Sequence, residues 1–190
     1  MMRKVMMIVA AFVAVVTVSL LAADGSYAQD APVTDADARA ELLAACPICD
    51  VDLTGYTGPL TQAEVESLLL ALNDEYHAYA VYASVIDQFG AVRPVTNIQR
   101  AETNHANAVV RLMERYAVPV PENAWLGADF PFDSLGEACA AGVEAELLNR
   151  DLYDILFAST DRADLTRVFA SLQRASEENH LPAFERCAGW

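Results

Sequence analysis

One stretch of apolar residues repeats with the spacing of an α-helix and restricts the fold more than any other feature. Its members, which keep to one helix face over several turns, are Val65, Leu68, Leu69, Leu72, Tyr79, Tyr82 and Ile86. Thr61 and Glu64 precede the stretch with the spacing of a capping box, in which both side chains hydrogen-bond to first-turn amides. Gly90 ends the pattern. The pattern therefore predicts one long helix from Thr61 to Gly90.

Three further helical segments follow this one. Pro94 suits the first turn of the second helix, and Pro119 follows its end. The stretch 118–133 contains several prolines and no helical period, so it reads as a long connection. Ser134 and Glu137 form a second capping box that opens the third helix, and Thr160 or Asp161 caps the fourth. The four predicted helices end near Gly90, Tyr116, Ser159 and Cys187.

No alternating apolar pattern of a β-strand is present along the chain. The sequence therefore predicts an all-α protein in which residues 61–187 form an antiparallel four-helix bundle. Two helical hairpins are joined by one long crossover, which is one of the ways in which such bundles are connected.

Composition excludes two classes of protein. The 190 residues carry a formal net charge of -15, and 54% of them are hydrophobic. The hydrophobic share is too high for a disordered chain. A nucleic-acid binder needs a basic surface to meet phosphates, so the acidic balance argues against that function.

The first 28 residues have the pattern of a signal peptide. Arg3 and Lys4 precede an uncharged stretch over 5–23, and Ser26-Tyr27-Ala28 has the small-x-small form of a cleavage site. We expect cleavage after Ala28 and a periplasmic or secreted protein that does not contact the membrane afterwards. A retained membrane anchor is the alternative, because the apolar stretch is almost long enough to span a bilayer.

Residues 29–60 form an N-terminal extension that includes a predicted short helix over 35–45 and a Cys-x-x-Cys motif. The cysteines are Cys46, Cys49, Cys139 and Cys187. An even number in an exported protein favours structural disulfides, and four cysteines allow three pairings. A redox pair or a metal site at Cys46 and Cys49 is the alternative.

Two of the three histidines share a local motif. Glu102 lies three residues before His105, and Glu177 lies three residues before His180. Residues three apart lie on one face of a helix, so each pair can direct a carboxylate and an imidazole at one point. The pairs fall on the second and fourth predicted helices. The third histidine, His77, is turned away from Glu75 on its helix and is predicted to be a surface or supporting group.

The first and third helices repeat a second pattern. Glu75 is followed seven residues later by Tyr82, and Glu146 is followed seven residues later by Tyr153. Glu144 competes with Glu146, because it lies nearer an apolar stripe. We follow the repeat and predict Glu146. The two tyrosines are predicted either to fill the core or to serve catalysis, by a hydrogen bond to a ligand or as a one-electron relay.

These residues together form a set typical of a two-metal site, with one contribution from each helix. The predicted ligands are Glu75, Glu102, His105, Glu146, Glu177 and His180. Four carboxylates buried together would be very costly without compensating charge, and two divalent cations supply it. Carboxylate and imidazole ligands suit iron, manganese or zinc. We expect two iron ions, with manganese or zinc as alternatives.

At these residues the sequence resembles the ferritin-like superfamily, and it is most similar to an uncharacterised bacterial branch of it. The resemblance covers about residues 58–186 and is carried by phrases such as LLLALNDEYHAYAVYASVIDQFG and NIQRAETNHANAVVRLMERYAVPVP. It implies a ferritin-like bundle with a two-metal centre at the six ligands named above. Superfamily members include ferroxidases, peroxidases, oxygenases and mineral stores.

We therefore expect an exported two-metal protein that oxidises Fe(II) or reduces O₂ or H₂O₂, which would make it a ferroxidase or peroxidase. A non-catalytic metal-binding or iron-storage protein is one alternative. A disulfide-stabilised helical bundle that binds a partner is the other. The sequence leaves open whether the chain forms a homo-oligomer.

Overall fold

The protein is described by a computed structural model over residues 34–189, so the expected signal peptide lies outside the described residues. Within this range every regular element is helical and no strand occurs, so the predicted all-α class is confirmed. The elements are α1 (Asp35–Ala45), α2 (Gln62–Phe89), α3 (Val95–Arg115), α4 (Leu135–Phe157), α5 (Ala163–Ala175), the π-helical segment η3 (Ser176–His180) and α6 (Leu181–Ala188).

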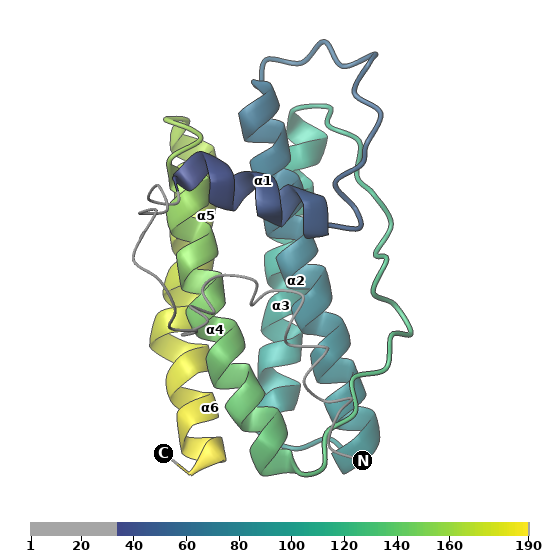
Figure 1. Ribbon diagram of the computed structural model, residues 1–190, viewed down its shortest axis with the longest axis vertical. Helices are drawn as coiled ribbons and strands as arrows, with labels where there is room; N and C mark the ends of the chain where they lie inside the picture. Colours follow the sequence, from purple (N-terminus) through teal and green to yellow (C-terminus); the bar gives the residue numbers. More distant parts are fainter. Residues whose placement is uncertain (1–33, 190) are drawn as a thin grey trace, which may run out of the picture.

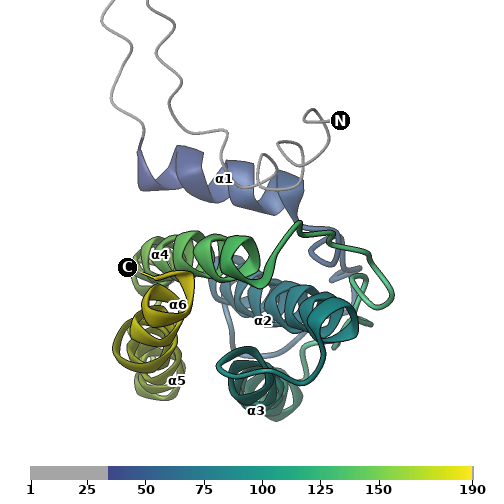
Figure 2. The same cartoon turned by 90° about the horizontal axis from the view of Figure 1, so that it is seen from below.

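Four long rods lie side by side, formed by α2, α3, α4 and the continuous run of α5, η3 and α6 (Figure 1, Figure 2). The most extensive packing is between α2 and α3 and between α4 and α6. Residues 116–134 run along the length of the molecule from the end of α3 to the start of α4 (Figure 1). Because of this long connection, α3 and α4 point in the same direction.

The capping boxes explain where two rods begin. Thr61 Oγ1 accepts a hydrogen bond from the Glu64 amide, and the Glu64 carboxylate accepts one from the Thr61 amide. At α4, Ser134 accepts from the Glu137 amide, but the Glu137 carboxylate accepts from the amide of Asp133 instead of Ser134. The first box is therefore complete, and the second is only half formed.

The predicted cap of the fourth rod was wrong. Its N-cap is Arg162, which makes no side-chain capping bond, and neither Thr160 nor Asp161 takes that position. The Thr160 hydroxyl instead donates to Glu64 Oε1 at 2.7 Å, and Arg162 Nε donates to the same oxygen at 2.9 Å. A buried carboxylate on α2 thus binds two side chains near the start of α5 and ties the two rods together.

The four rods enclose two separate apolar clusters. One contains buried residues from the start of α2, the end of α3, the end of α4 and from α5, such as Leu69, Met113, Leu156 and Phe169. The other takes residues from the opposite ends of these rods, such as Val85, Ile98, Val143 and Phe184. The middle of each rod lies between the clusters, and this is where the polar residues described below are found.

The N-terminal helix α1 lies across the outer side of α2 and α4 (Figure 2). Arg39 anchors it, because its guanidinium donates to Ser67 Oγ at 2.9 Å and pairs with Glu66 at 3.2 Å. Two disulfides are formed, Cys46–Cys49 after α1 and Cys139–Cys187 between α4 and α6. The latter pairing fixes the end of the chain to the start of α4.

Within residues 34–189, no helix is both long enough and apolar enough to cross a membrane.

Candidate metal centre

A buried polar layer separates the two apolar clusters. Each rod contributes one nearly inaccessible side chain to it, namely Glu75 from α2, Glu102 from α3, Glu146 from α4 and His180 from η3, with exposures of 2–4%. His105, on the same face of α3 as Glu102, is somewhat more accessible. Ionisable groups are rarely buried without partners, because taking a charge out of water is costly. The layer therefore requires mutual compensation or bound cations.

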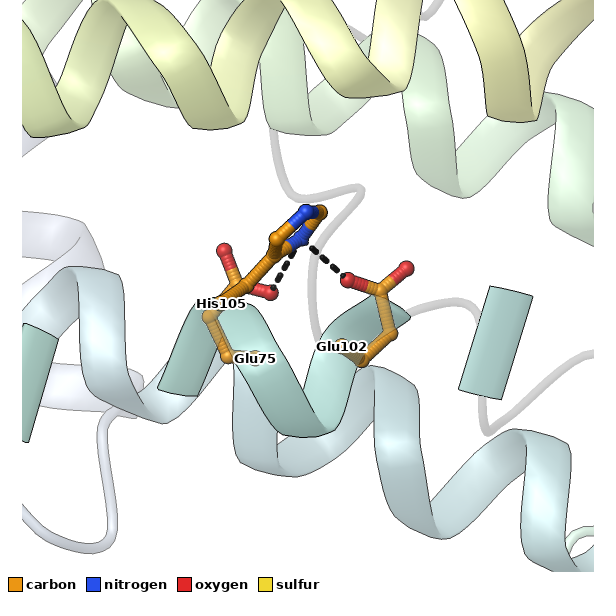
Figure 3. Close-up of side chains that lie close together, drawn as sticks. All are labelled: Glu75, Glu102 and His105. Atoms are coloured by element: carbon orange, nitrogen blue, oxygen red, sulfur yellow. Dashed lines mark hydrogen bonds and ion pairs between the residues drawn. The ribbon is translucent and has the colours of Figure 1, made fainter. Parts of the chain in front are cut away.

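The first group of candidate ligands comes from α2 and α3. His105 Nδ1 lies 2.8 Å from Glu102 Oε2 and 3.3 Å from Glu75 Oε2 (Figure 3). All three side chains offer ligand atoms within 4.8 Å of one another. Ligand atoms about 2.1 Å from one ion lie at most about 4.2 Å apart, so small side-chain shifts would close this group on a metal.

The second group joins α3, α4 and η3. His180 Nδ1 lies 3.1 Å from Glu102 Oε1 and 3.5 Å from Glu146 Oε1. Despite these distances, neither contact has the geometry of a hydrogen bond, so His180 Nδ1 has no hydrogen-bond partner. A buried ring nitrogen that faces two carboxylates without bonding to them is well placed to bind a cation. The donor set therefore fits a metal of the kind that oxygen and imidazole ligands prefer.

Glu102 belongs to both groups. Its Oε2 faces His105 and its Oε1 faces His180, so one carboxylate lies between two potential metal positions. The two imidazole rings are stacked with centroids 5.5 Å apart. A carboxylate with its oxygens shared in this way can bridge two ions.

The two predicted tyrosines support the carboxylates at the ends of the layer. Tyr82 on α2 donates to Glu146 on α4 at 3.1 Å, and Tyr153 on α4 donates to Glu75 on α2 at 2.9 Å. Both rings are buried in the apolar clusters. The tyrosines therefore take both predicted positions at once, with the ring in the core and the hydroxyl on a candidate ligand.

Glu177 is the one predicted ligand that the structure does not bring into the layer. Its side chain is exposed, whereas Ser176 and His180 are buried. The prediction assumed an α-helix, in which residues three apart share a face. This stretch is π-helical, and its wider turn brings residues four or five apart onto one side instead. Ser176 thus replaces Glu177 on the inner face.

The structure also separates the two candidates on α4. Glu146 is buried in the layer, and Glu144 is exposed. His77 lies outside both ligand groups, as predicted, but it is half buried and not a surface residue. Its ring packs edge-on against Trp125 and Phe130, with centroids 4.6 and 5.4 Å away. Burial lowers the pKa of His77 to about 4, so its ring is neutral at pH 7.

Sequence reasoning missed two polar residues beside the layer. Asn149 is buried, and its side-chain amide donates to Asp74 Oδ2 at 2.5 Å. Asp74 is partly buried, and burial raises its pKa to about 7. The signal for Asn149 was present, because it follows Glu146 by three residues, as His105 follows Glu102. Asp74 has no comparable spacing signal.

The carboxylates and imidazoles shift one another's protonation in the metal-free protein. Burial raises the pKa of Glu75 and of Glu146. Burial also acts on Glu102, but the two histidines outweigh it and lower the pKa of Glu102 to about 2. For the imidazoles, burial is outweighed by the carboxylates, and the pKa rises to about 10 in His105 and about 9 in His180. The metal-free layer therefore holds two imidazolium cations at neutral pH.

We expect the metal-free protein to lose stability as the pH rises from 7 to 9. A histidine whose pKa is raised by folding contributes stability that is complete below pH 6.5 and lost as the pH approaches 9 or 10. The raised pKa values of Glu75 and Glu146 act in the same direction, because the folded state binds more protons. Urea unfolding should show a decrease larger than about 1.4 kcal/mol, the equivalent of one pKa unit. A constant or rising free energy of unfolding would contradict this charge pattern.

Comparison with known proteins adds a family match and one relative. Residues 64–130 match the model of a family described as an uncharacterized protein domain, DUF2202. The matched segment holds α2, α3 and part of the crossover, and therefore includes Glu75, Glu102 and His105.

The relative is "Uncharacterized protein MJ0754" of Methanocaldococcus jannaschii, which is 28% identical over 143 residues. The alignment covers 67% of this chain and 76% of the relative. A crystal structure described as hypothetical protein MJ0754 from Methanococcus jannaschii superposes with a TM-score of 0.62 at 25% identity, over 69% of this chain and 82% of that one. These similarities support the helical fold, and neither name states an activity.

Proposed function

We propose that this protein is an exported, ferritin-like four-helix bundle that binds two divalent metal ions, iron foremost, and oxidises Fe(II) with H₂O₂ or O₂. The observation that carries the proposal is the position of Glu102 between His105 and His180, with Glu75 and Glu146 at the two ends. Such a carboxylate-bridged pair is the arrangement found in the cores of two-metal helical bundles.

The charges of the layer support two cations and not one. Three ligand carboxylates and the nearby Asp74 carry four negative charges when they are ionised, and two divalent ions would balance them. Metal binding would displace the protons that the imidazoles hold in the metal-free protein, because only a neutral imidazole has a free lone pair. The hydroxyls of Tyr82 and Tyr153 would then fix the orientation of Glu146 and Glu75.

When bound, a pair of ferrous ions would supply two electrons, which with two protons reduce H₂O₂ to two water molecules. The chain's own residues would hold the ions and exclude bulk water. Apolar clusters close the layer on two sides, so that charge interactions inside it are strong. Export agrees with the two disulfides, which persist in oxidising compartments.

The test is metal content followed by turnover. Mature protein from residue 29 onward, purified from its exported compartment, should contain close to two metal ions per chain, mostly iron, by mass spectrometry. After anaerobic loading with Fe(II), it should consume H₂O₂ or O₂ with matching oxidation of iron, faster than the same iron without protein. Two bound metals without turnover would favour a metal-binding or storage protein. No metal after loading would overturn the proposal.

A further inference from the structure

A pocket opens beside the candidate metal centre, between α2, α4 and the crossover. Its volume is about 130 Å³, and most of its lining is apolar. The apolar lining comes from all three segments and includes Ala78, Val81, Phe130, Phe132, Ala145 and Leu148. Ala145 and Leu148 are exposed, so the pocket is open to solvent on this side of α4.

The pocket reaches the two ligand groups unequally. Its wall includes Glu102 and Glu146, whereas the other candidate ligands, Glu75, His105 and His180, do not line it. Glu102 and Glu146 are together members of the second group, and the first group meets the pocket only through the shared Glu102. The two potential metal positions therefore differ in access, because a molecule in the pocket lies nearer the position beside His180.

The lining favours a molecule that is small, neutral and apolar. A hydrated cation would have to give up water against a mainly apolar wall, which is costly. H₂O₂ brings two hydroxyl donors, and carboxylates that hold metal ions leave few acceptors free for them. O₂ has no charge and no donor, so it loses little on leaving water. An apolar cavity of about 150 Å³, close to this size, is known to take up xenon, which is also small and apolar.

We propose that this pocket is the entry site for O₂, and that O₂ meets the ion held by Glu102, Glu146 and His180 before it meets the other ion. The assignment to O₂ rests on the function proposed above. Uptake of a small apolar molecule by the pocket does not depend on that function, so the two can be tested separately.

Xenon is the probe, because it is apolar, similar in size to O₂ and visible by anomalous X-ray scattering. Crystals of the mature protein would be pressurised with xenon in two forms, metal-free and loaded with Zn(II). We expect a xenon atom in contact with Ala78, Val81 or Leu148 in both forms. In the zinc-loaded form it should lie nearer the ion beside His180 than the ion beside His105. Absence of xenon from the pocket, or the reverse order of distances, would overturn the proposal.

Ala145→Phe should fill the pocket, and Leu147→Phe is its matched control. Both residues are exposed on α4, so both variants should fold, and only Ala145 lines the pocket. A phenyl ring has the size of benzene, for which a cavity of about 150 Å³ is sufficient. Xenon occupancy should therefore fall to less than about a third in the first variant and stay unchanged in the second. Equal occupancy in the two variants would contradict binding at this pocket.

Oxidation rates of the Fe(II)-loaded variants test the assignment to O₂. Two ferrous ions and two protons reduce one O₂ to H₂O₂, and Ala145→Phe should slow this oxidation in line with its loss of xenon. Oxidation by added H₂O₂ should be affected less, and uptake of Zn(II) should be unchanged. Equal slowing with both oxidants would overturn the assignment to O₂. Slower uptake of Zn(II) would identify the pocket as a route for cations and overturn it as well.

Metal content is measured on the same samples, which separates the two proposals. Xenon in the pocket of protein that takes up no metal would remove the two-metal function, and with it the assignment to O₂. Two bound zinc ions without xenon in the pocket would leave the metal centre in place and overturn the entry site.

Discussion

Glu102→Gln is expected to reduce the metal content from two ions per chain to less than one. Glu102 is the only side chain that belongs to both ligand groups, with one oxygen toward His105 and the other toward His180. Glutamine keeps the size of the side chain but removes the negative charge and replaces one oxygen with an NH₂ group, which cannot bind a cation. Loss of groups that merely orient ligands lowers metal affinity about 10–100-fold, so loss of a shared ligand should exceed that range.

Glu177→Gln is the matched control, because Glu177 is the predicted ligand that the structure leaves exposed. It should keep two ions per chain and unchanged affinity. Both variants should retain the helical circular dichroism spectrum of the parent protein. A variant with Gln at 102 that still holds two ions would refute the bridging role. Loss of an ion from the variant at 177 would show that this side chain turns inward when metal binds.

Removal of the Cys139–Cys187 disulfide is the second change with a large expected effect. The two cysteines are 48 residues apart in sequence, whereas Cys46 and Cys49 are separated by 3. Loop-closure entropy predicts a loss of about 4 kcal/mol for the long loop and about 2 kcal/mol for the short one. For a chain of this size, the longer loop corresponds to a decrease in Tm of about 8–16 °C.

The experiment compares Cys139→Ala/Cys187→Ala with Cys46→Ala/Cys49→Ala by calorimetry of the metal-free proteins. Both variants lose one disulfide, so the prediction concerns the order of their melting temperatures. The variant without Cys139–Cys187 should have the lower Tm. An equal decrease, or a larger one for the Cys46 and Cys49 variant, would contradict it. We also expect weaker metal binding in the first variant, because this disulfide holds α6, which directly follows His180, against α4.

Most of the fold was predictable because helix signals are local. Caps at Thr61 and Ser134, the glycine at 90 and the apolar periodicity depend on residues within a few positions of one another. The cap of the fourth rod was not predictable, since Thr160 is drawn to Glu64, a residue far away in sequence. The disulfide pairing was also open, because it depends on how α6 lies against α4.

The candidate site was also predictable only where its signals are local in sequence. Helical spacing and the repeat between the two halves are visible in the sequence. They were sufficient to select five residues that the structure brings together, namely Glu75, Glu102, His105, Glu146 and His180. The structure leaves Glu177 outside the layer because the π-helical turn changes which residues share a face, and we recognised no signal for this turn in the sequence. Asp74 was missed because its role comes from contact with Asn149 on another rod.

The two ligand groups differ in how much of the chain must be folded before they exist. Glu75, Glu102 and His105 all come from the α2–α3 hairpin, which the family match also covers. Glu146 and His180 come from the other hairpin and need Glu102 to complete their group. We therefore expect an order of assembly, in which a first ion can associate with one hairpin and the second waits until the hairpins have docked. On unfolding, the ions would leave in the reverse order. Loss of the ion held by Glu102, Glu146 and His180 would therefore mark the separation of the two hairpins.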